Sequence, residues 1–184
     1  SIECHKNNLV VSVDNPVPED FTSHYDRKEQ GLVVDYVIIM GYDEHYVGSD
    51  AGSVASLPWV EQGVQDTIAE VTPERTILAI PFYTRLWKTT GGAVTSEAIG
   101  MDEAQNVLST NGVEVAWDGS VGQNYATFEQ DNSTYQIWLE DAQSIAEKVK
   151  LIQKYNLAGV AQWKLGFENS SIWQTISDNL QAAS

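Results

Sequence analysis

Four short apolar runs recur along the chain with polar or helix-like segments between them. They are rich in Val, Ile and Leu and show no strict alternation of apolar and polar positions, which is typical of strands buried on both faces of a parallel sheet. The runs are Leu9–Val13, Leu32–Met40, Thr76–Ile80 and Leu157–Trp163. We therefore predict four parallel strands.

The segments between these runs have helical patterns. Pro58–Val71 begins with proline at the expected first helical position and places apolar residues along one side. Asp141–Tyr155 carries an apolar stripe, with carboxylates at its start and lysines toward its end, which matches the helix dipole. Ser170 or Ser171 is expected to cap a last helix. The alternation of strand and helix predicts an α/β fold.

One segment, residues 88–138, breaks this alternation. It contains a helical pattern near Met101–Leu108 and three strand-like pieces separated by Asn and Gly turns, at Val113–Trp117, Tyr125–Phe128 and Tyr135–Leu139. We interpret it as an α+β insertion subdomain, and residues 1–87 and 139–184 as one α/β unit. The pair Gly91-Gly92 is interpreted as a hinge.

Four βα units are too few for a closed (β/α)8 barrel, which takes about 250 residues. The pattern therefore leaves two architectures open, a small doubly wound sheet or a part of a larger barrel.

Composition narrows the choice of partners. The 184 residues include 10 Lys and Arg against 26 Asp and Glu, a formal charge of −16, which disfavours nucleic acid and anionic membrane surfaces. No apolar run approaches the roughly 18 residues of a membrane helix. The single cysteine excludes an internal disulfide, and the three histidines lack the spacing of a metal site, so we predict no metal. The acidity also disfavours a polyanionic substrate, whereas a neutral sugar or peptide remains open as the ligand.

The candidate functional residues lie just after the predicted strands, where the functional groups of α/β folds are usually found. Tyr42 and Asp43 follow the second strand, where they can donate and accept hydrogen bonds, although an acidic turn that caps the next element is an equal alternative. The third strand leads into Phe82–Trp87 and the fourth ends at Trp163. Aromatic rings there suit the apolar faces of sugars, whereas Phe82 is expected in the core. Glu140 and Asp141 are expected to begin a helix.

Five segments in this order resemble the C-terminal part of a family-18 glycoside hydrolase, the chitinase-like (β/α)8 family, and within it the bacterial spore-cortex and cell-wall N-acetylglucosaminidase branch. They are Asp35–His45, Leu57–Val60, Ile80–Tyr83, Trp138–Asp141 and Gly159–Glu168. The resemblance implies an α/β fold that is the C-terminal half, strands 5–8, of a TIM barrel, with the α+β insertion between strands 7 and 8. It implies hydrolysis of β-1,4-linked N-acetylglucosamine glycans, peptidoglycan or chitin, without metal or organic cofactor.

The resemblance also implies residue roles. Tyr42 would hold the N-acetyl group of the sugar in the cleavage subsite, and Asp43 would contact the same region. Trp163 would stack under the sugar ring and Met40 would pack beside these residues. Further sugar contacts would come from the seventh strand and the loop after it, namely Tyr83, Arg85 and Trp87. The family mechanism is substrate-assisted, because the N-acetyl oxygen attacks the anomeric carbon after a glutamic acid protonates the leaving oxygen.

The chain departs from the family pattern at this acid. The family carries it on the fourth strand in a D-x-x-D-x-D-x-E motif, and these 184 residues contain no such motif. We expect the first four strands, the N-terminal half of the barrel, to be missing and the chain alone to be inactive, since a lost proton donor costs about 10² to 10⁴ in rate.

Half a barrel would leave strand edges at Leu9–Val13 and Leu157–Trp163, so we expect the chain either to self-associate or to rearrange into an open sheet. Two alternatives to a hydrolase fragment remain: a non-catalytic glycan-binding protein on the same scaffold, and a doubly wound domain with an unrelated ligand. A secreted, cell-envelope or spore-associated location would fit the leading interpretation.

Overall fold

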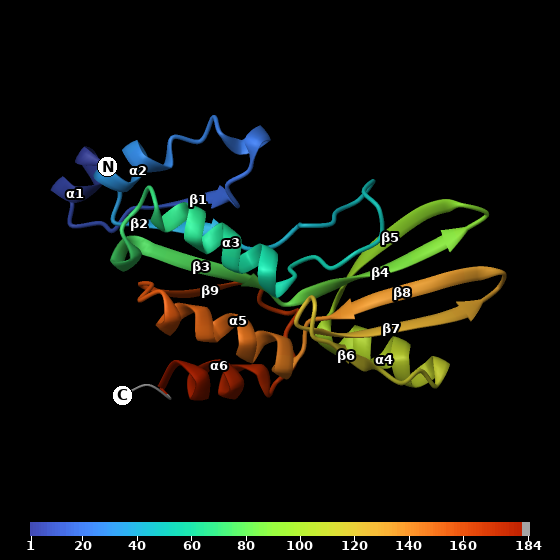
Figure 1. Ribbon diagram of the computed structural model, residues 1–184. Helices are drawn as coiled ribbons and strands as arrows, with labels where there is room; N and C mark the ends of the chain where they lie inside the picture. Colours follow the sequence, from blue (N-terminus) through green and yellow to red (C-terminus); the bar gives the residue numbers. More distant parts are fainter. Residues whose placement is uncertain (182–184) are drawn as a thin grey trace.

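Two β-sheets lie end to end along the long axis of the molecule (Figure 1). The structure is a computed structural model, and it describes residues 1–181. The first sheet, sheet A, is parallel and contains β1 (Ser12–Pro16), β2 (Tyr36–Met40), β3 (Thr76–Pro81) and β9 (Gly159–Trp163), in the order β1-β2-β3-β9. The predicted α/β class with four parallel strands is therefore confirmed.

Three of these strands, β1, β2 and β9, begin later than predicted, β9 at Gly159 rather than at Leu157. Leu9 and Val10 precede β1 as exposed residues, and Leu32 and Val33 belong to helix α2 (Arg27–Val33), which also leaves them exposed. The predicted runs were read from apolar character alone, and that character does not separate a strand from the apolar residues before it. Three short elements were not predicted. They are α1 (Ile2–Lys6) and the two 3-10 turns η1 (Asp20–Thr22), between β1 and α2, and η2 (Pro73–Arg75).

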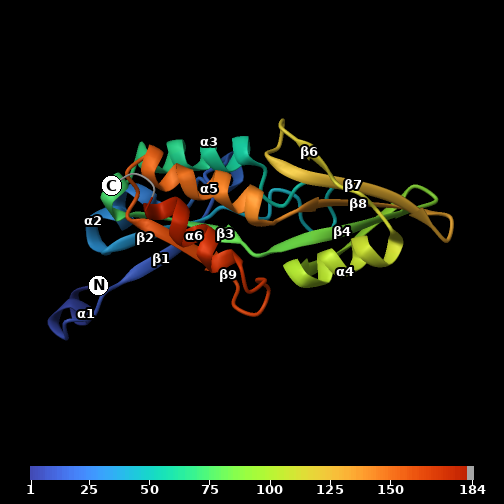
Figure 2. The same ribbon diagram turned by 90° about the horizontal axis from the view of Figure 1, so that it is seen from below.

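Three helices cover one face of sheet A (Figures 1 and 2). They are α3 (Leu57–Ile68), α5 (Ala142–Lys154) and α6 (Ile172–Gln181), close to the predicted helices. Their apolar stripes pack against the buried side chains of β2 and β3 to form the main core, for example Val60 and Ile145 with Ile39. The opposite face carries Tyr36, Ile38 and Met40, which are exposed or half-buried. None of the described helices is both long enough and apolar enough to cross a membrane.

The second sheet, sheet B, is antiparallel with the order β5-β4-β8-β7-β6. Its strands are β4 (Tyr83–Thr90), β5 (Ala93–Gly100), β6 (Ala116–Asp118), β7 (Gln123–Gln130) and β8 (Ser133–Leu139). Helix α4 (Met101–Asn111) packs on one face through a second, smaller core that includes Leu108 and Ile137.

The hairpin of β4 and β5 was missed in the sequence. Gly91 and Gly92 have φ angles of 56° and 87° and form its turn, so their interpretation as a hinge is wrong. Two successive positive φ angles suit the tight turns that match the twist of paired strands. Sheet B thus begins at Tyr83, and we keep the division into a partial barrel and an insertion as a proposal.

Candidate functional site

The predicted site residues meet at the carboxyl-terminal edge of sheet A. Tyr42 and Asp43 follow β2, Tyr83 begins β4 directly after β3, and Trp163 ends β9. Register pairs Met40 with Ala79 and Pro81 with Trp163, so neighbouring strands end at a common edge. Because the strands are parallel, residues far apart in sequence lie side by side there.

Close contacts join these residues. The Tyr83 hydroxyl donates a short hydrogen bond to Asp43 Oδ1. The ring centroid of Tyr42 lies 6.2 Å from that of Tyr83 and 6.4 Å from that of Trp163. Trp163 remains 52% exposed, which leaves ring surface available to a ligand. A carboxylate, two phenols and an indole therefore share one small region.

The backbone before these side chains is tightly constrained. A Cβ added at Gly41 would approach the Leu78 side chain to 2.9 Å and the Ala79 carbonyl oxygen to 3.0 Å, so glycine permits this close passage. Asp43 has a φ of 68°, in the left-handed region that few residues other than glycine adopt. Such strain persists only where the surroundings fix it, and it is common at functional sites.

Both phenols remain protonated near neutral pH. Burial, together with the nearby carboxylates of Asp14 and Asp43, raises the pKa of Tyr42 to about 12. Burial and the hydrogen bond to Asp43 also raise the pKa of Tyr83. The Tyr83 hydroxyl donates its hydrogen bond to Asp43. The Tyr42 hydroxyl donates to none of residues 1–181 and is available to a ligand.

Two pockets flank Asp43. The first, which we call the Arg85 pocket, has a volume of about 190 Å³ and is lined by Asp43, Tyr83, Arg85, Ala98, Trp163 and Phe167. The second, the Trp59 pocket, has a volume of about 240 Å³ and is lined by Pro16, Val17, Glu19, Phe21, Met40, Tyr42, Asp43, Tyr46 and Trp59. Asp43 lines both, so the two pockets are neighbours.

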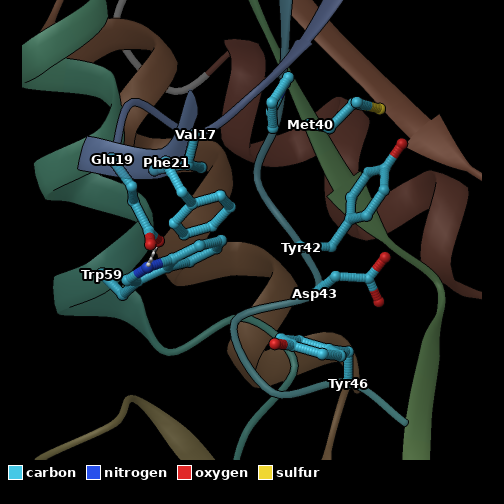
Figure 3. Close-up of a pocket in the computed structure, with 9 residues that line it drawn as sticks. Val17, Glu19, Phe21, Met40, Tyr42, Asp43, Tyr46 and Trp59 are labelled. Atoms are coloured by element: carbon cyan, nitrogen blue, oxygen red, sulfur yellow. Dashed lines mark hydrogen bonds between the residues drawn. The ribbon is translucent and has the colours of Figure 1, made fainter. Parts of the chain in front are cut away.

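The Trp59 pocket brings in residues that the sequence analysis missed. Figure 3 shows Phe21 and Trp59 on one side of it and Met40, Tyr42 and Asp43 on the other. The Trp59 indole N–H donates to Glu19 Oε1 at 3.0 Å, and Phe21 is 73% exposed. The signal that could have pointed to this pocket is Trp59, an aromatic residue in the first turn of α3.

Two acidic residues near the site have structural roles. Glu44 accepts hydrogen bonds from the Ser56 backbone N–H at 2.7 Å and the Ser56 hydroxyl at 2.9 Å, where α3 begins. The acidic turn after β2 therefore does cap the next helix, as the alternative interpretation expected, and the residue that does so is Glu44. Asp141 caps α5, as predicted. Residues 1–181 contain no group of three or more His, Cys, Asp or Glu that could hold a metal ion.

One predicted sugar contact is wrong. Trp87 is only 1% exposed, and its indole N–H donates to the Gly52 carbonyl oxygen at 2.8 Å. Trp87 therefore packs under the site loop, residues 41–56 between β2 and α3, and has no free ring face for a sugar. Met40 and Arg85 do line the pockets, whereas Phe82 is fully buried in the core as expected.

Comparisons with known proteins agree on one family. The model of glycosyl hydrolases family 18 matches residues 2–168. The uncharacterized glycosylase YvbX of Bacillus subtilis is 27% identical over 86% of this chain, and the cortical fragment-lytic enzyme of the same organism is 26% identical over 84%. The chain spans only 46% and 36% of the lengths of these two relatives. A crystal structure of a chitinase from Chromobacterium violaceum superposes with a TM-score of 0.88 at 25% identity, covering 96% of this chain and 57% of that one.

Proposed function

The chain belongs to glycosyl hydrolases family 18, and on this premise we propose that its strand-end site binds a glycan containing β-1,4-linked N-acetylglucosamine. The observation that carries the proposal is the meeting of Tyr42, Asp43 and Trp163 at one edge of sheet A. The similarity to proteins named as a chitinase and a cortical fragment-lytic enzyme supports chitin or peptidoglycan as the glycan.

Each side chain has a proposed role. Trp163 supplies an exposed ring on which the apolar face of a sugar stacks. The protonated Tyr42 hydroxyl donates to the N-acetyl carbonyl oxygen, and Asp43, oriented by Tyr83, accepts from the N-acetyl N–H. This pair would hold the N-acetyl oxygen against the anomeric carbon, as substrate-assisted hydrolysis requires. Met40, the last residue of β2, lines the Trp59 pocket together with Tyr42.

Replacing Trp163 by alanine is expected to weaken glycan binding. Half of its surface is open to a sugar, so the lost burial amounts to about 1–2 kcal/mol, or about five- to thirtyfold in Kd. Titration of the 184-residue chain with an N-acetylglucosamine tetramer, followed by tryptophan fluorescence or NMR, measures this loss.

The matched control is Trp173→Ala. Trp173 is a partly exposed tryptophan on α6 that packs against Phe82, away from both pockets. Unchanged binding by Trp163→Ala, or no binding of the tetramer by the original chain, would refute the proposed site.

We further propose that sheet A is the strands 5–8 part of a (β/α)8 barrel. Its strand order follows the chain order, whereas a doubly wound sheet reverses direction at a switch point. The chain spans only about half of the length of its relatives, which supports this proposal.

A partial barrel is expected to self-associate. Within sheet A, β1 and β9 each pair with one strand, and the face with Tyr36, Ile38 and Met40 is uncovered by helices. Open edges and an apolar face favour pairing with another chain. Light scattering at micromolar concentration should give a mass above the 20.3 kDa of one chain. Ile38→Lys, which places a charge on this face, should shift the protein toward monomer, and a strictly monomeric parent chain would contradict the expectation.

A second candidate function is glycan binding without hydrolysis. Ring stacking on Trp163 and hydrogen bonds from Tyr42 and to Asp43 need no proton donor, so the same site serves this candidate. The sequence encoded before Ser1 separates the two candidates: an acidic motif there supports the hydrolase, and its absence supports the binding protein.

A further inference from the structure

Arg27, the first residue of α2, carries a buried positive charge. The residue is only 2% exposed, yet it takes part in no ion pair among residues 1–181. Burial lowers the pKa of its guanidinium, and the Glu70 carboxylate opposes this effect without forming an ion pair. The Arg27 Nε is also buried and has no hydrogen-bond acceptor in the same range. A charge buried in this way is costly, so stability alone does not account for it.

The guanidinium of Arg27 joins the two ends of one loop, residues 16–22, which runs from the end of β1 through η1. Its Nη2 donates to the Pro16 carbonyl oxygen at 3.0 Å and to Thr22 Oγ1 at 3.0 Å. Its Nη1 donates to the Thr22 carbonyl oxygen at 3.4 Å. The Thr22 hydroxyl oxygen in turn accepts from the Glu19 N–H at 2.8 Å. One side chain therefore fixes both ends of loop 16–22.

Loop 16–22 forms one wall of the Trp59 pocket (Figure 3). Glu19 and Phe21 line the pocket from this side, and Glu19 Oε1 accepts the hydrogen bond of the Trp59 indole N–H. Phe21 is 73% exposed and Glu19 is also exposed, so little packing holds these two side chains. The hydrogen bonds of Arg27 to the loop supply the restraint that packing does not. Side chains that are ordered before a ligand arrives lose less entropy when it binds.

A second polar contact holds α2 against β1. Asn15 Nδ2 donates to Gln30 Oε1 at 2.6 Å, and Asn15 is only 1% exposed. Gln30 lies three residues after Arg27, so both side chains leave the same face of α2. Arg27 therefore acts from a helix that is itself anchored next to Pro16, where the loop begins.

Resting on the proposed glycan-binding function, we propose that Arg27 is a positioning residue for the Trp59 pocket. Its buried guanidinium does not meet the ligand, and it acts by holding loop 16–22 in the conformation that walls the pocket. Tyr42 and Asp43 line the same pocket, so a glycan that extends from the strand-end site in this direction lies along the wall. Affinity for such a glycan therefore depends on Arg27.

Titration of the 184-residue chain with the N-acetylglucosamine tetramer tests this inference. Arg27→Met removes all the donors and should weaken binding about tenfold, because Glu19 and Phe21 must then be ordered by the ligand. Arg27→Lys keeps the charge but loses the planar fork that reaches both loop ends, so it should also weaken binding. Thr22→Val deletes the hydroxyl that Arg27 contacts and should reproduce the loss, whereas Thr22→Ser should keep the parent affinity.

Arg75→Met is the matched control. The Arg75 Nη1 also donates to a backbone carbonyl oxygen of α2, that of Gly31 at 2.8 Å, but Arg75 lies outside loop 16–22 and lines neither pocket. This variant should lower stability and leave the affinity for the tetramer unchanged.

The Trp59 indole N–H provides a readout that a purely structural role would not move. Its NMR resonance in isotope-labelled protein reports the hydrogen bond to Glu19, and Glu19→Ala gives the position of the resonance without that bond. The resonance should move toward this position in Arg27→Met and stay in place in Arg75→Met.

Parent-like affinity or an unmoved Trp59 resonance in folded Arg27→Met overturns the inference and leaves the proposed function standing. If Arg27→Met does not fold, Thr22→Val decides by the same two readouts. Failure of the parent chain to bind the tetramer overturns the proposed function itself, and the Trp59 resonance then still decides whether Arg27 holds the pocket wall.

Discussion

Replacing Lys148 by methionine is expected to lower the free energy of unfolding by about 3–5 kcal/mol. The Lys148 ammonium donates to both carboxylate oxygens of Glu140, at 2.8 and 3.0 Å, and both side chains are 0% exposed. The Ser144 hydroxyl donates to the same carboxylate at 2.8 Å. Removal of the ammonium would leave a buried carboxylate without a counter-charge, which costs far more than the loss of an exposed ion pair.

The variant should also respond to pH in a defined direction. Burial already raises the pKa of Glu140, and the Lys148 ammonium and the Ser144 hydroxyl oppose that rise. In Lys148→Met the pKa rises further, so the folded variant retains a proton that the unfolded chain releases near its ordinary pKa of about 4.3. The variant therefore becomes less stable as pH rises, and its deficit relative to the parent chain should shrink toward pH 5.

Denaturant unfolding of matched variants measures these effects. Lys150→Met removes an exposed lysine from the same helix and should change stability by no more than about 0.5 kcal/mol. The double variant Glu140→Leu/Lys148→Met removes both charges and should recover most of the loss. A loss below about 1 kcal/mol for Lys148→Met would contradict the importance of the buried pair.

The buried pair belongs to a network that reaches the site loop. Gln123 donates to Glu140 Oε1 at 2.9 Å and accepts a short hydrogen bond from the Ser53 hydroxyl. The Leu57 N–H also donates to the Val121 carbonyl oxygen at 2.8 Å, where α3 begins. Sheet B and α5 thus hold the loop that carries Asp43, and sheet B also lines the Arg85 pocket through Arg85 and Ala98.

The sequence predicted elements whose signals are local. The apolar stripe of α5 and its capping residue Asp141 lie within a few residues of each other, and the helix begins and ends as expected. The pair Tyr42 and Asp43 after β2 likewise pointed to the site without knowledge of distant contacts. Their meeting with Trp163 required only the rule that parallel strands end at one edge.

The remaining errors depend on contacts that the sequence does not display. Lys148 was expected to interact with the helix dipole, whereas it points to Glu140 and is buried. Trp87 was expected to contact the glycan. Its side chain instead leaves β4 toward the site loop, where its indole N–H donates to the Gly52 carbonyl oxygen. The Trp59 pocket combines residues before α2, after β2 and in α3, so its composition follows from tertiary structure alone.

We expect the purified 184-residue chain to show no measurable turnover of an N-acetylglucosamine glycan, even where it binds one. The carboxylates at the site have other tasks: Asp43 accepts from Tyr83, and Glu44 accepts from Ser56 at the start of α3. Neither supplies the proton that the leaving oxygen needs, and loss of a positioned proton donor costs about 10² to 10⁴ in rate, or about 3–5 kcal/mol of transition-state stabilisation.

The assay compares this chain with a complete family-18 chitinase on the same chitooligosaccharide, with product release followed by chromatography. The complete enzyme shows that the substrate is competent, and the binding titration shows that the chain engages it. Any turnover by this chain above the rate of a sample without protein would contradict the prediction. If such turnover were abolished by Asp43→Asn, the reaction would belong to this site, and a proton donor among these 184 residues would have to replace the absent motif.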